Sequence, residues 1–368
     1  MKVQRIHVDN KEYPLYILID GNYEIVQPVL KYIKYLDNTG KSPNTIKSYC
    51  YHLKLFYVFM EQSNITLEMV NFEEMSNFVG WLMNPSGDIK VTNLQEKKSK
   101  REESTVNTII NAVTSYFEYL VRLECVKISD VFREKRGRSF KGFLHHVSKG
   151  STYSKNILKL RDKKKRKKTL DFSEVSAIMN ACHTYRDKLI LLLMYEGGLR
   201  IGEVLSLRLE DVVTWDNEIH ITPREENIND AYVKFRKERV IHVSKELMSL
   251  YTNYLVHEYC EELNHDCVFI VLKDSHFGKP LKYQSVLELI RRLRKRTGIS
   301  FNPHMLRHTH ATELIRNGWD VAYVQNRLGH ANVQTTLNTY VHLSDQDMKN
   351  EYSKYLKGRE QKGDGKIE

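Results

Sequence analysis

Cysteine is scarce in this sequence, and the few cysteines show no pairing pattern. The chain has five, an odd number, and no two of them form a CxxC pair. Disulfide frameworks and zinc ribbons both need cysteines in pairs at characteristic spacings. The sequence therefore favours neither, and we expect these cysteines to be reduced packing residues.

Long apolar runs are missing too, and so is a secretion signal. The longest purely apolar run, LILLLMY at residues 189–195, falls far below the roughly 20 residues that span a bilayer. The N-terminal stretch MKVQRIHVDN is charged and lacks the apolar region of a signal peptide, and a strand-like YPLYILI follows it. We expect no membrane segment and a protein that stays in the cytoplasm.

Acidic residues are too few to balance the basic ones. The 57 Lys and Arg exceed the 46 Asp and Glu by a formal net charge of +11, and the excess is clustered. KNILKLRDKKKRKK at residues 155–168 carries nine basic residues and one acidic residue, and RRLRKR at residues 291–296 lies in a helical context. Basic side chains beside phosphates release counterions favourably, so both blocks favour a nucleic acid as partner. For either block alone, a merely soluble basic surface is the alternative.

The length of the chain predicts two domains. At 368 residues it exceeds what a single hydrophobic core usually organises. From its N-terminus the sequence divides into five expected parts: a short arm (1–20), a helical domain (21–128), a basic linker (129–172), a second domain (173–355) and a tail (356–368).

The helical domain and the linker contain candidate DNA-binding residues. Apolar residues recur at helical spacing in IVQPVLKYIKYL and in STVNTIINAVTSYFEYLVRLE, and NTGKSPN separates the first helix from a second that resumes at Thr45. Near that break Lys41, Thr45 and Lys47 could hold phosphates, although ordinary caps and exposed charge explain them equally well. In the linker the candidates for contact with a DNA backbone are Lys163, Lys164, Lys165 and Arg166.

The second domain is predicted to be mainly helical with a small antiparallel β-sheet. TLDFSEVSAIMNAC opens it behind an Asp or Ser cap, and helices are expected at residues 186–196 and 199–207. EIHIT and YVKFRKERVIHV are strand-like, the latter a hairpin candidate that turns near residues 236–238. Further helices follow, and the last, NPHMLRHTHATELIRNG, has Asn302 as its cap and Pro303 in its first turn.

Two arginine-containing boxes suit the cleavage of a phosphodiester. GLRIGE places Arg200 and Glu203 one turn apart, and HMLRH places His304 and Arg307 one turn apart. The transition state of phosphoryl transfer concentrates negative charge on non-bridging oxygens, which two guanidiniums can bind bidentately. Arg200 and Arg307 suit that role, and Glu203 suits a group that orients an arginine.

The remaining boxes offer a nucleophile, a base and an acid. LGHANVQTTLNTY ends in Tyr340, ten residues after His330. A phenol becomes a usable nucleophile when a neighbouring group accepts its proton, for which His304 or His330 is available. The leaving 5′-oxygen needs a proton, which Lys234 of the predicted hairpin can supply. Lys237 is its rival, because the insertion REENINDAY lengthens the segment before the hairpin.

In order and context these boxes resemble the tyrosine recombinases, the phage integrase family, with its Arg, Lys, His-x-x-Arg, His and Tyr signature. GLRIGE, HMLRHTHAT and LGHANVQTT followed by a tyrosine carry the resemblance, which covers residues 170–355, and the helical first half resembles the family's core-binding domain. The resemblance implies that Tyr340 attacks the scissile phosphate and forms a 3′-phosphotyrosyl bond, with no metal ion, ATP or other cofactor. It also implies double-stranded DNA as partner, four protomers on paired sites and no membrane.

A narrower resemblance concerns the kind of mobile element. The N-terminal arm and YIKYLDNTGKSPNTIKSYCYHLKLFYVFM look like the transposase A proteins of site-specific transposons, which move by tyrosine recombination. This resemblance implies a bacterial site-specific recombinase or transposase that works with accessory transposition proteins and associates with the nucleoid when bound to DNA.

The sequence leaves other functions open. A phage-type integrase or Xer-like recombinase would use the same chemistry, and a type IB topoisomerase-like enzyme would relax DNA without exchanging strands between partners. A DNA-binding regulator that does not cut would need only the basic surface and could dispense with Tyr340. His304, His308 and His310 also suit a metallohydrolase, since His304 and His308 are four residues apart on a helix. HMLRH, however, has an arginine where a zinc motif would have a general-base glutamate.

Overall fold

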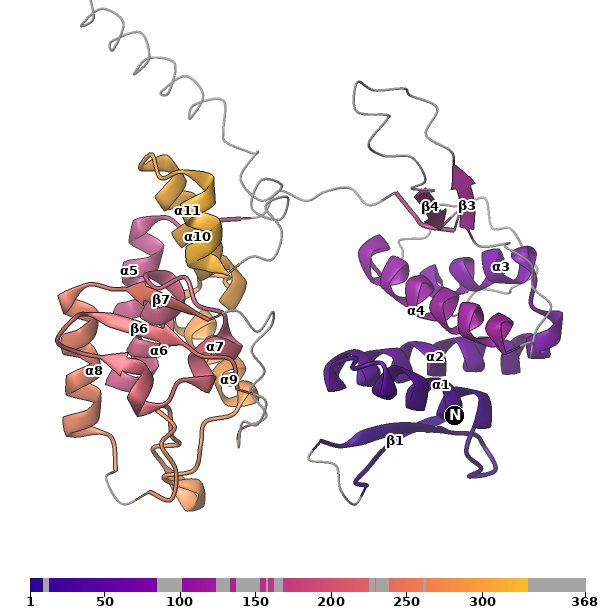
Figure 1. Cartoon of the computed structure of the whole chain (residues 1–368), viewed down its shortest axis with the longest axis horizontal. Coiled ribbons are helices and arrows are strands. Elements are labelled where there is room, and N and C mark those ends of the chain that lie inside the picture. The colour runs from indigo at the N-terminus through magenta and orange to yellow at the C-terminus, as the bar shows by residue number, and fades with distance from the viewer. Residues whose placement is uncertain are drawn as a thin grey trace, which may run out of the picture. The chain divides into compact units, whose positions relative to one another are not determined.

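The computed structural model divides the chain into two compact units, each with its own hydrophobic core (Figure 1). The units are residues Met1–Lys164 and Lys165–Glu368, and the division falls within the predicted linker. The structure describes residues 1–8, 13–84, 101–123, 133–136, 153–156, 158–161, 168–224, 229, 238–260 and 263–329, with 133–136 and 153–156 by their backbone alone.

The first unit is a β-hairpin packed on helices. β1 (Lys2–Ile6) pairs antiparallel with β2 (Leu15–Ile19), and Leu18 of β2 is fully buried among side chains of the helices. The two strands within the predicted arm therefore belong to the first unit, and Leu18 joins its helical core. The helical elements that follow are α1 (Gln27–Asn38), α2 (Pro43–Ser63), the 3-10 helix η1 (Leu67–Met69), α3 (Phe72–Met83) and α4 (Glu103–Arg122).

Local chemistry explains the break between α1 and α2. Gly40 follows α1 with a φ of +70°, a left-handed conformation that glycine adopts without strain. Ser42 then caps α2 by accepting a hydrogen bond from the N–H of Thr45, and Pro43 occupies the first helical position. The predicted break at NTGKSPN is confirmed.

Aromatic rings fill the core of the first unit. Phe56 of α2 meets Phe78 of α3 and Phe117 of α4 edge to face, with ring centroids 5.1 and 5.5 Å apart. The hydroxyls of Tyr57 and Tyr116 lie 2.8 Å apart, so each satisfies the other within the core. One aromatic cluster thereby joins α2, α3 and α4.

Part of the predicted linker is attached to the first unit. β3 (Arg133–Arg136) and β4 (Tyr153–Asn156) pair antiparallel. Beyond them, the amide of Asn107 on α4 forms two hydrogen bonds with the backbone of Leu160, at 2.8 and 3.1 Å. The chain is therefore held against α4 shortly before it leaves this unit.

The second unit is built around α6 (Tyr185–Tyr195). Leu189, Ile190 and Leu191 are buried, and α6 packs against α5 (Phe172–Asn180), α7 (Ile201–Ser206), α8 (Lys245–His257) and α10 (Pro303–Arg316). The run LILLLMY is thus the buried centre of a domain. The other elements of this unit are η2 (Leu209–Asp211), β5 (Val212–Val213), β6 (Glu218–Ile221), β7 (Arg239–His242), η3 (Asp274–His276), α9 (Tyr283–Thr297) and α11 (Val321–Leu328).

A small antiparallel sheet, in the order β5-β6-β7, crosses in front of α6 in Figure 1. Ile219 of β6 lies opposite Ile241 of β7, and both side chains are buried. The predicted fold class, mainly α with a small antiparallel sheet, is confirmed. EIHIT forms β6, whereas YVKFRKERVIHV contributes β7 from Arg239 onward, and most of its predicted turn near residues 236–238 lies outside the described residues.

Helix caps in the second unit follow the sequence closely. Asp171 caps α5 in a reciprocal capping box with Glu174, and Asn302 caps α10 by accepting from the N–H of Met305. Both caps were predicted. The helix expected from residue 199 begins two residues later, because Arg200 has an extended backbone with φ −76° and ψ 150°.

Two expectations drawn from composition can be compared with the structure. Cys50, Cys182, Cys260 and Cys267 carry free thiols, and burial raises the pKa of Cys50 and Cys182 to about 12. These four form no disulfide with one another. Across the described ranges, no helix is long and apolar enough to cross a membrane.

Candidate active site

A single buried carboxylate organises the start of α7. The backbone N–H of Arg200 donates to Oε2 of Glu203 at 2.9 Å, and the Arg200 guanidinium donates from Nη1 to Oε1 at 2.7 Å. Glu203 is fully buried, while the Arg200 side chain keeps 15% exposure. The same carboxylate therefore caps the helix and orients the arginine that precedes it.

Two further arginines meet Glu203 from distant parts of the chain. Arg239, the first residue of β7, donates from Nη2 to Oε2 at 2.8 Å, and Nη1 of Arg307 on α10 lies 3.6 Å from the same oxygen. Burial alone would raise the pKa of Glu203, but Arg239, then Arg307 and Arg200, lower it more, so the pKa lies below its ordinary value. Glu203 is thus ionised at neutral pH within an arginine–glutamate cluster of Arg200, Glu203, Arg239 and Arg307.

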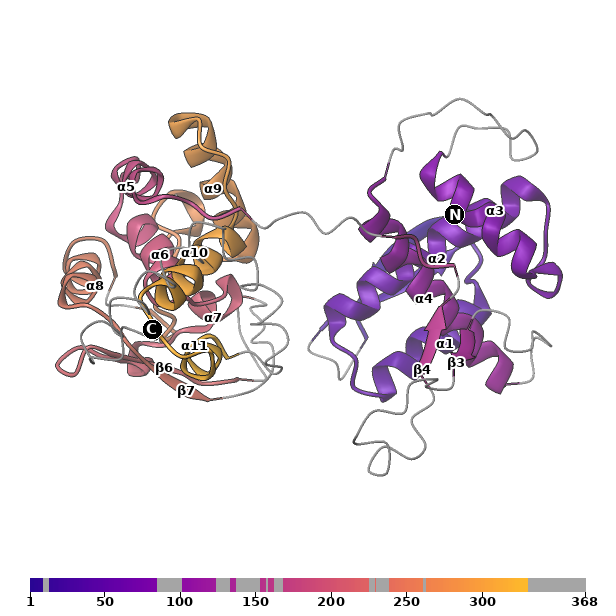
Figure 2. The same ribbon diagram turned by 90° about the horizontal axis from the view of Figure 1, so that it is seen from above.

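The C-terminus of α11 completes this cluster. The carbonyl of Leu328 accepts from Arg307 Nη2 and, at 3.3 Å, from Arg200 Nη1, while the carbonyl of Gly329 accepts from Arg200 Nη2 at 3.2 Å. Arg239 donates from Nε to the carbonyl of Arg327 at 2.9 Å. Carbonyls at a helix C-terminus lack partners within the helix and carry its negative end, so guanidiniums suit them. Figure 2 shows α11 beside α10 and β7, which brings these groups together.

A buried histidine supports the same helix end. Nε2 of His310 accepts from Nε of Arg327 at 3.1 Å, and Arg327 Nη2 donates to the carbonyls of Glu196 and His242 at 3.1 and 2.9 Å. Burial, then Arg327 and Arg307, lower the pKa of His310 to about 3. His310 is therefore neutral and acts as an acceptor that holds α11 on α10.

Gly198 allows the close approach of these elements. A Cβ at this position would lie 2.6 Å from Cδ2 of His310 and 3.0 Å from a methyl carbon of Leu328, and the residue has a φ of +65°. Its carbonyl accepts from Arg307 Nη1 at 2.6 Å. The Gly-Gly stop after α6 thus also makes room for the histidine and the helix end.

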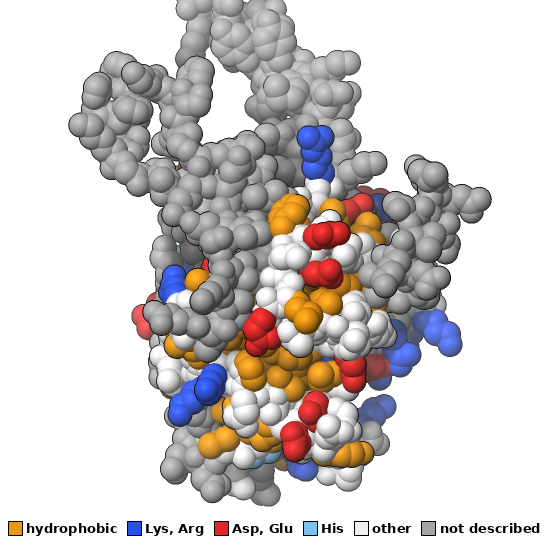
Figure 3. All heavy atoms as spheres, turned by 90° about the vertical axis from the view of Figure 1, so that its right-hand side faces the viewer, with side chains coloured by type: hydrophobic (Ala, Val, Ile, Leu, Met, Phe, Trp, Pro, Cys, Tyr) orange, Lys and Arg blue, Asp and Glu red, His pale blue; other side chains and the backbone are white. Residues whose placement is uncertain are grey.

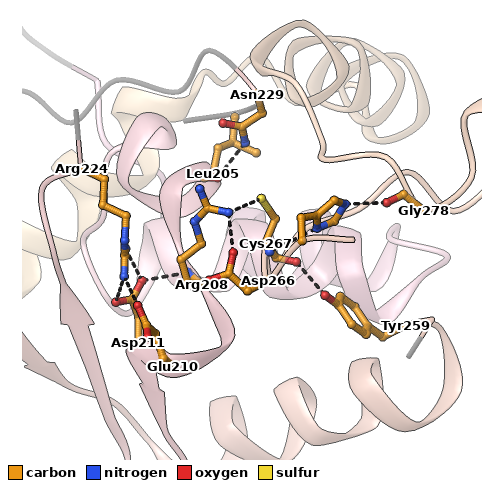
Figure 4. Close-up of polar contacts among 11 residues, drawn as sticks. Leu205, Arg208, Glu210, Asp211, Arg224, Asn229, Tyr259, Asp266, Cys267 and Gly278 are labelled. Atoms are coloured by element: carbon orange, nitrogen blue, oxygen red, sulfur yellow. Dashed lines mark hydrogen bonds and ion pairs between the residues drawn. The ribbon is translucent and has the colours of Figure 1, made fainter. Parts of the chain in front are cut away.

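The segment between β6 and β7 is anchored at two described positions, both visible in Figure 4. Arg224 pairs with both carboxylate oxygens of Asp211 at 2.7 and 2.8 Å and with Glu210 at 2.7 Å. The buried amide of Asn229 donates to the carbonyls of Leu205 and Leu281 at 2.8 and 3.1 Å. Arg224 and Asn229 are therefore both held by hydrogen bonds to the second unit.

The structure brings together part of the predicted site. Arg200, Glu203 and Arg307 share contacts, and His304 lies one turn before Arg307 on α10 with an exposed side chain. The other predicted catalytic residues lie outside the described residues: Lys234 and its rival Lys237, His330 and Tyr340. No group of three or more His, Cys, Asp or Glu side chains suited to a metal ion occurs within the described part of the chain.

The predicted DNA-binding residues of the first unit have ordinary local contacts. Thr45 uses its N–H and its hydroxyl on Ser42 at the start of α2, and Nζ of Lys47 lies 5.5 Å from the ring centroid of Tyr16. Lys41 is exposed in the connection before α2. The linker candidates lie outside the described residues: Lys163, Lys164, Lys165 and Arg166.

Two family models match this chain in the order in which the units occur. The phage integrase N-terminal SAM-like domain matches residues 29–124, and the phage integrase family matches residues 168–347. Transposase A from transposon Tn554 of Staphylococcus aureus is 69% identical over 362 residues, which cover 98% of this chain and 100% of that protein. The chain belongs to the phage integrase family. It is a site-specific tyrosine recombinase, as the sequence resemblance implied.

Other proteins have lower sequence identity to this recombinase, and solved structures among them have a similar fold. The tyrosine recombinase XerA of Saccharolobus solfataricus is 27% identical, over 88% of this chain and 91% of that protein. The Tn1549 transposon integrase, solved with a circular intermediate DNA, has a TM-score of 0.60 at 16% identity and covers 89% of this chain and 99% of that one. A lambda integrase dimer bound to a core site has a TM-score of 0.56 at 14% identity, covering 87% and 97%. These structures show the shared fold.

Sequence reasoning missed three residues of the recombinase that hold the cluster together. Arg239, His310 and Arg327 are joined to it by the hydrogen bonds given above. Arg239 stands at the start of a strand-like stretch and Arg327 in the last turn of a helix, both places where an exposed arginine is ordinary. Only His310, in a helix beside two predicted site residues, carried any signal, and it was grouped with metal-binding alternatives.

Acidification should destabilise the recombinase through His310. Because its folded pKa is about 3 and that of an unfolded histidine about 6.5, only the unfolded chain takes up this proton between those values. The free energy of unfolding should therefore fall by about 2 kcal/mol between pH 7.5 and pH 5. Urea denaturation of wild type and His310→Gln, whose amide accepts a hydrogen bond but does not titrate, measures this contribution. Parallel pH slopes for the two proteins would contradict it.

Proposed function

We propose that this recombinase is a transposase of the transposase A type, which cleaves and rejoins double-stranded DNA through a 3′-phosphotyrosyl intermediate. The observation that carries the proposal is the pair of guanidiniums, Arg200 and Arg307, held together by Glu203 and by the carbonyl of Leu328. The 69% identity to transposase A of Tn554 along nearly the whole chain supports the narrower assignment.

Arg200 and Arg307 would bind the non-bridging oxygens of the scissile phosphate. Arg307 is almost fully buried and Arg200 is partly exposed, so a phosphate would meet this pair from the side of Arg200. Since Glu203 and the end of α11 already hold both guanidiniums, little reorganisation would accompany the build-up of charge in the transition state. Glu203 orients these arginines and takes no part in proton transfer.

Tyr340, His330 or His304, and Lys234 would carry out the chemical steps. The Tyr340 oxygen attacks phosphorus and gives its proton to one of the two histidines, while the bond from phosphorus to the 5′-oxygen breaks. Lys234 protonates that oxygen, because an alkoxide is a far stronger base than a phenolate. The phosphotyrosyl bond conserves the energy of the phosphodiester, so a 5′-hydroxyl of another strand can reverse the reaction without ATP.

The first unit and the linker would complete the grip on DNA. The net charge of +11 and the basic residues near the boundary between the units support contact with the phosphate backbone. On the face of the first unit that Figure 3 shows, acidic and hydrophobic side chains stand together and the coloured Lys and Arg lie toward the edges. A duplex would therefore bind elsewhere on this unit. Exchange between two duplexes would use four protomers, with accessory transposition proteins, in the cytoplasm.

The test is whether a covalent adduct forms on element-end DNA. Purified protein is incubated with a nicked duplex that carries candidate transposon ends, in the presence of EDTA, and the products are separated by denaturing electrophoresis. We expect a protein–DNA adduct, with the nucleotide found on the peptide that contains Tyr340. Bound DNA that yields no adduct across authentic ends would contradict the proposal and favour a regulator that does not cut. Salt dependence of binding would not distinguish the two, because both use phosphate contacts.

A further inference from the structure

Arg239, which the sequence did not single out, binds two different partners in the arginine–glutamate cluster. Its side chain is 9% exposed, and its guanidinium binds Glu203 through Nη2 and the carbonyl of Arg327 through Nε. The two bonds point to different elements, α7 and α11, while Arg239 itself belongs to β7. One planar group thus joins three segments that lie far apart in the sequence.

Arg239 is one of three guanidiniums that share the Glu203 carboxylate. Glu203 supplies one negative charge to three guanidiniums at 2.7, 2.8 and 3.6 Å. The remaining positive charge faces the carbonyls of Arg327, Leu328 and Gly329 at the negative end of α11. A lysine could not reach a carboxylate and a carbonyl at once in the same plane, because its ammonium is a single point charge.

Gly329 shows how closely Arg239 approaches the helix end. A Cβ at position 329 would lie 2.8 Å from Nη1 and 3.0 Å from Cζ of Arg239, and the residue also has a φ of +62°. Glycine is required there for its backbone conformation and for the space that the guanidinium takes. His330 is the next residue in the chain, so the turn that Arg239 contacts is the one from which that histidine follows.

We propose that Arg239 is a positioning residue for strand cleavage: it fixes the Glu203 carboxylate and the Leu328–Gly329 turn, and through them orients Arg200 and Arg307. The inference rests on the proposed function of that site. A direct role as a phosphate ligand is the alternative, and measuring the cleavage rate and the DNA affinity of each variant in parallel distinguishes the two roles.

Two substitutions test Arg239 directly, and a third tests it from the side of α11. Arg239→Lys keeps a cation, and Arg239→Met keeps a long apolar side chain. Gly329→Ala leaves Arg239 unchanged but places a methyl group against its guanidinium. Arg208→Met is the matched control, because the Arg208 side chain is also 9% exposed and also pairs with a carboxylate, that of Asp266, outside the cluster. Single-turnover cleavage of the nicked duplex at saturating DNA is measured together with DNA affinity.

We expect both Arg239 variants and Gly329→Ala to slow cleavage about 100-fold with DNA affinity within about threefold of wild type. Arg239→Met combined with Gly329→Ala should be no slower than the slower single variant, because both disturb one contact. Arg208→Met should cleave within a few-fold of wild type.

Three outcomes would overturn the inference. Wild-type cleavage in Arg239→Met would show that the residue is dispensable, and a parallel loss of affinity and rate would make it a phosphate ligand. If Arg239→Lys fails to fold, Arg239 has a structural role rather than a positioning role. If only Arg239→Met fails to fold, the cleavage rates of Arg239→Lys and Gly329→Ala decide between the two roles. Absence of an adduct from the wild-type protein would instead overturn the proposed function.

Discussion

A Tyr340→Phe variant is expected to bind element-end DNA with unchanged affinity and to form no covalent adduct. The substitution removes only the phenolic oxygen, so the bond to phosphorus cannot form, whereas contacts with the phosphate backbone remain. The loss should be complete in the nicked-duplex assay, which traps cleaved product. Binding is followed in parallel by mobility shift at the same salt concentration.

Tyr323→Phe is the matched control for this prediction. Tyr323 lies on α11 in the same unit and is 70% exposed, so it tests whether loss of any nearby phenol affects cleavage. It should form as much adduct as the wild type. An adduct that survives in Tyr340→Phe would mean that another tyrosine is the nucleophile.

Glu203→Gln is expected to destabilise the second unit by about 3–5 kcal/mol. The amide has nearly the shape of the carboxylate, but it leaves the guanidiniums of Arg200, Arg239 and Arg307 without the buried negative charge that now pairs with them. Its N–H groups would also face N–H donors. Urea denaturation at neutral pH, where Glu203 is ionised, measures the loss.

Glu313→Gln provides the comparison for Glu203→Gln. Glu313 is half-buried on α10 and accepts a hydrogen bond from the Tyr195 hydroxyl at 3.0 Å, and burial raises its pKa. Because a neutral amide can also accept that bond, the change should cost about 1 kcal/mol or less. If both variants lose the same free energy of unfolding, the negative charge of Glu203 does not contribute to stability.

Helix boundaries were the part of the fold that could be predicted best from the sequence. Capping residues bind the backbone within three positions, so the local sequence is sufficient to predict where a helix begins. The examples are Ser42 with Pro43, Asp171 with Glu174, and Asn302 with its following proline. The start of α7 was misplaced because Arg200 takes an extended backbone to share the Glu203 carboxylate. The pairing of β7 with β6 was missed because the strands are joined through a long segment.

The sequence by itself determined the family and the candidate chemistry of this recombinase. The boxes around Arg200, Arg307 and Tyr340 are short, and their order along the chain does not depend on how the chain folds. The charge excess and the two-domain division are likewise properties of composition and length.

Only the tertiary structure decided which residues hold the arginines in place. Arg239, His310 and Arg327 become partners of the site through contacts between residues separated by many positions in the chain. A buried ion pair and a capped helix end depend on distance and exclusion of water, and neither can be read from residue type or spacing. The candidate reactive residues could therefore be proposed from the sequence, whereas the contacts that hold Arg200 and Arg307 depend on how β7, α10 and α11 pack together.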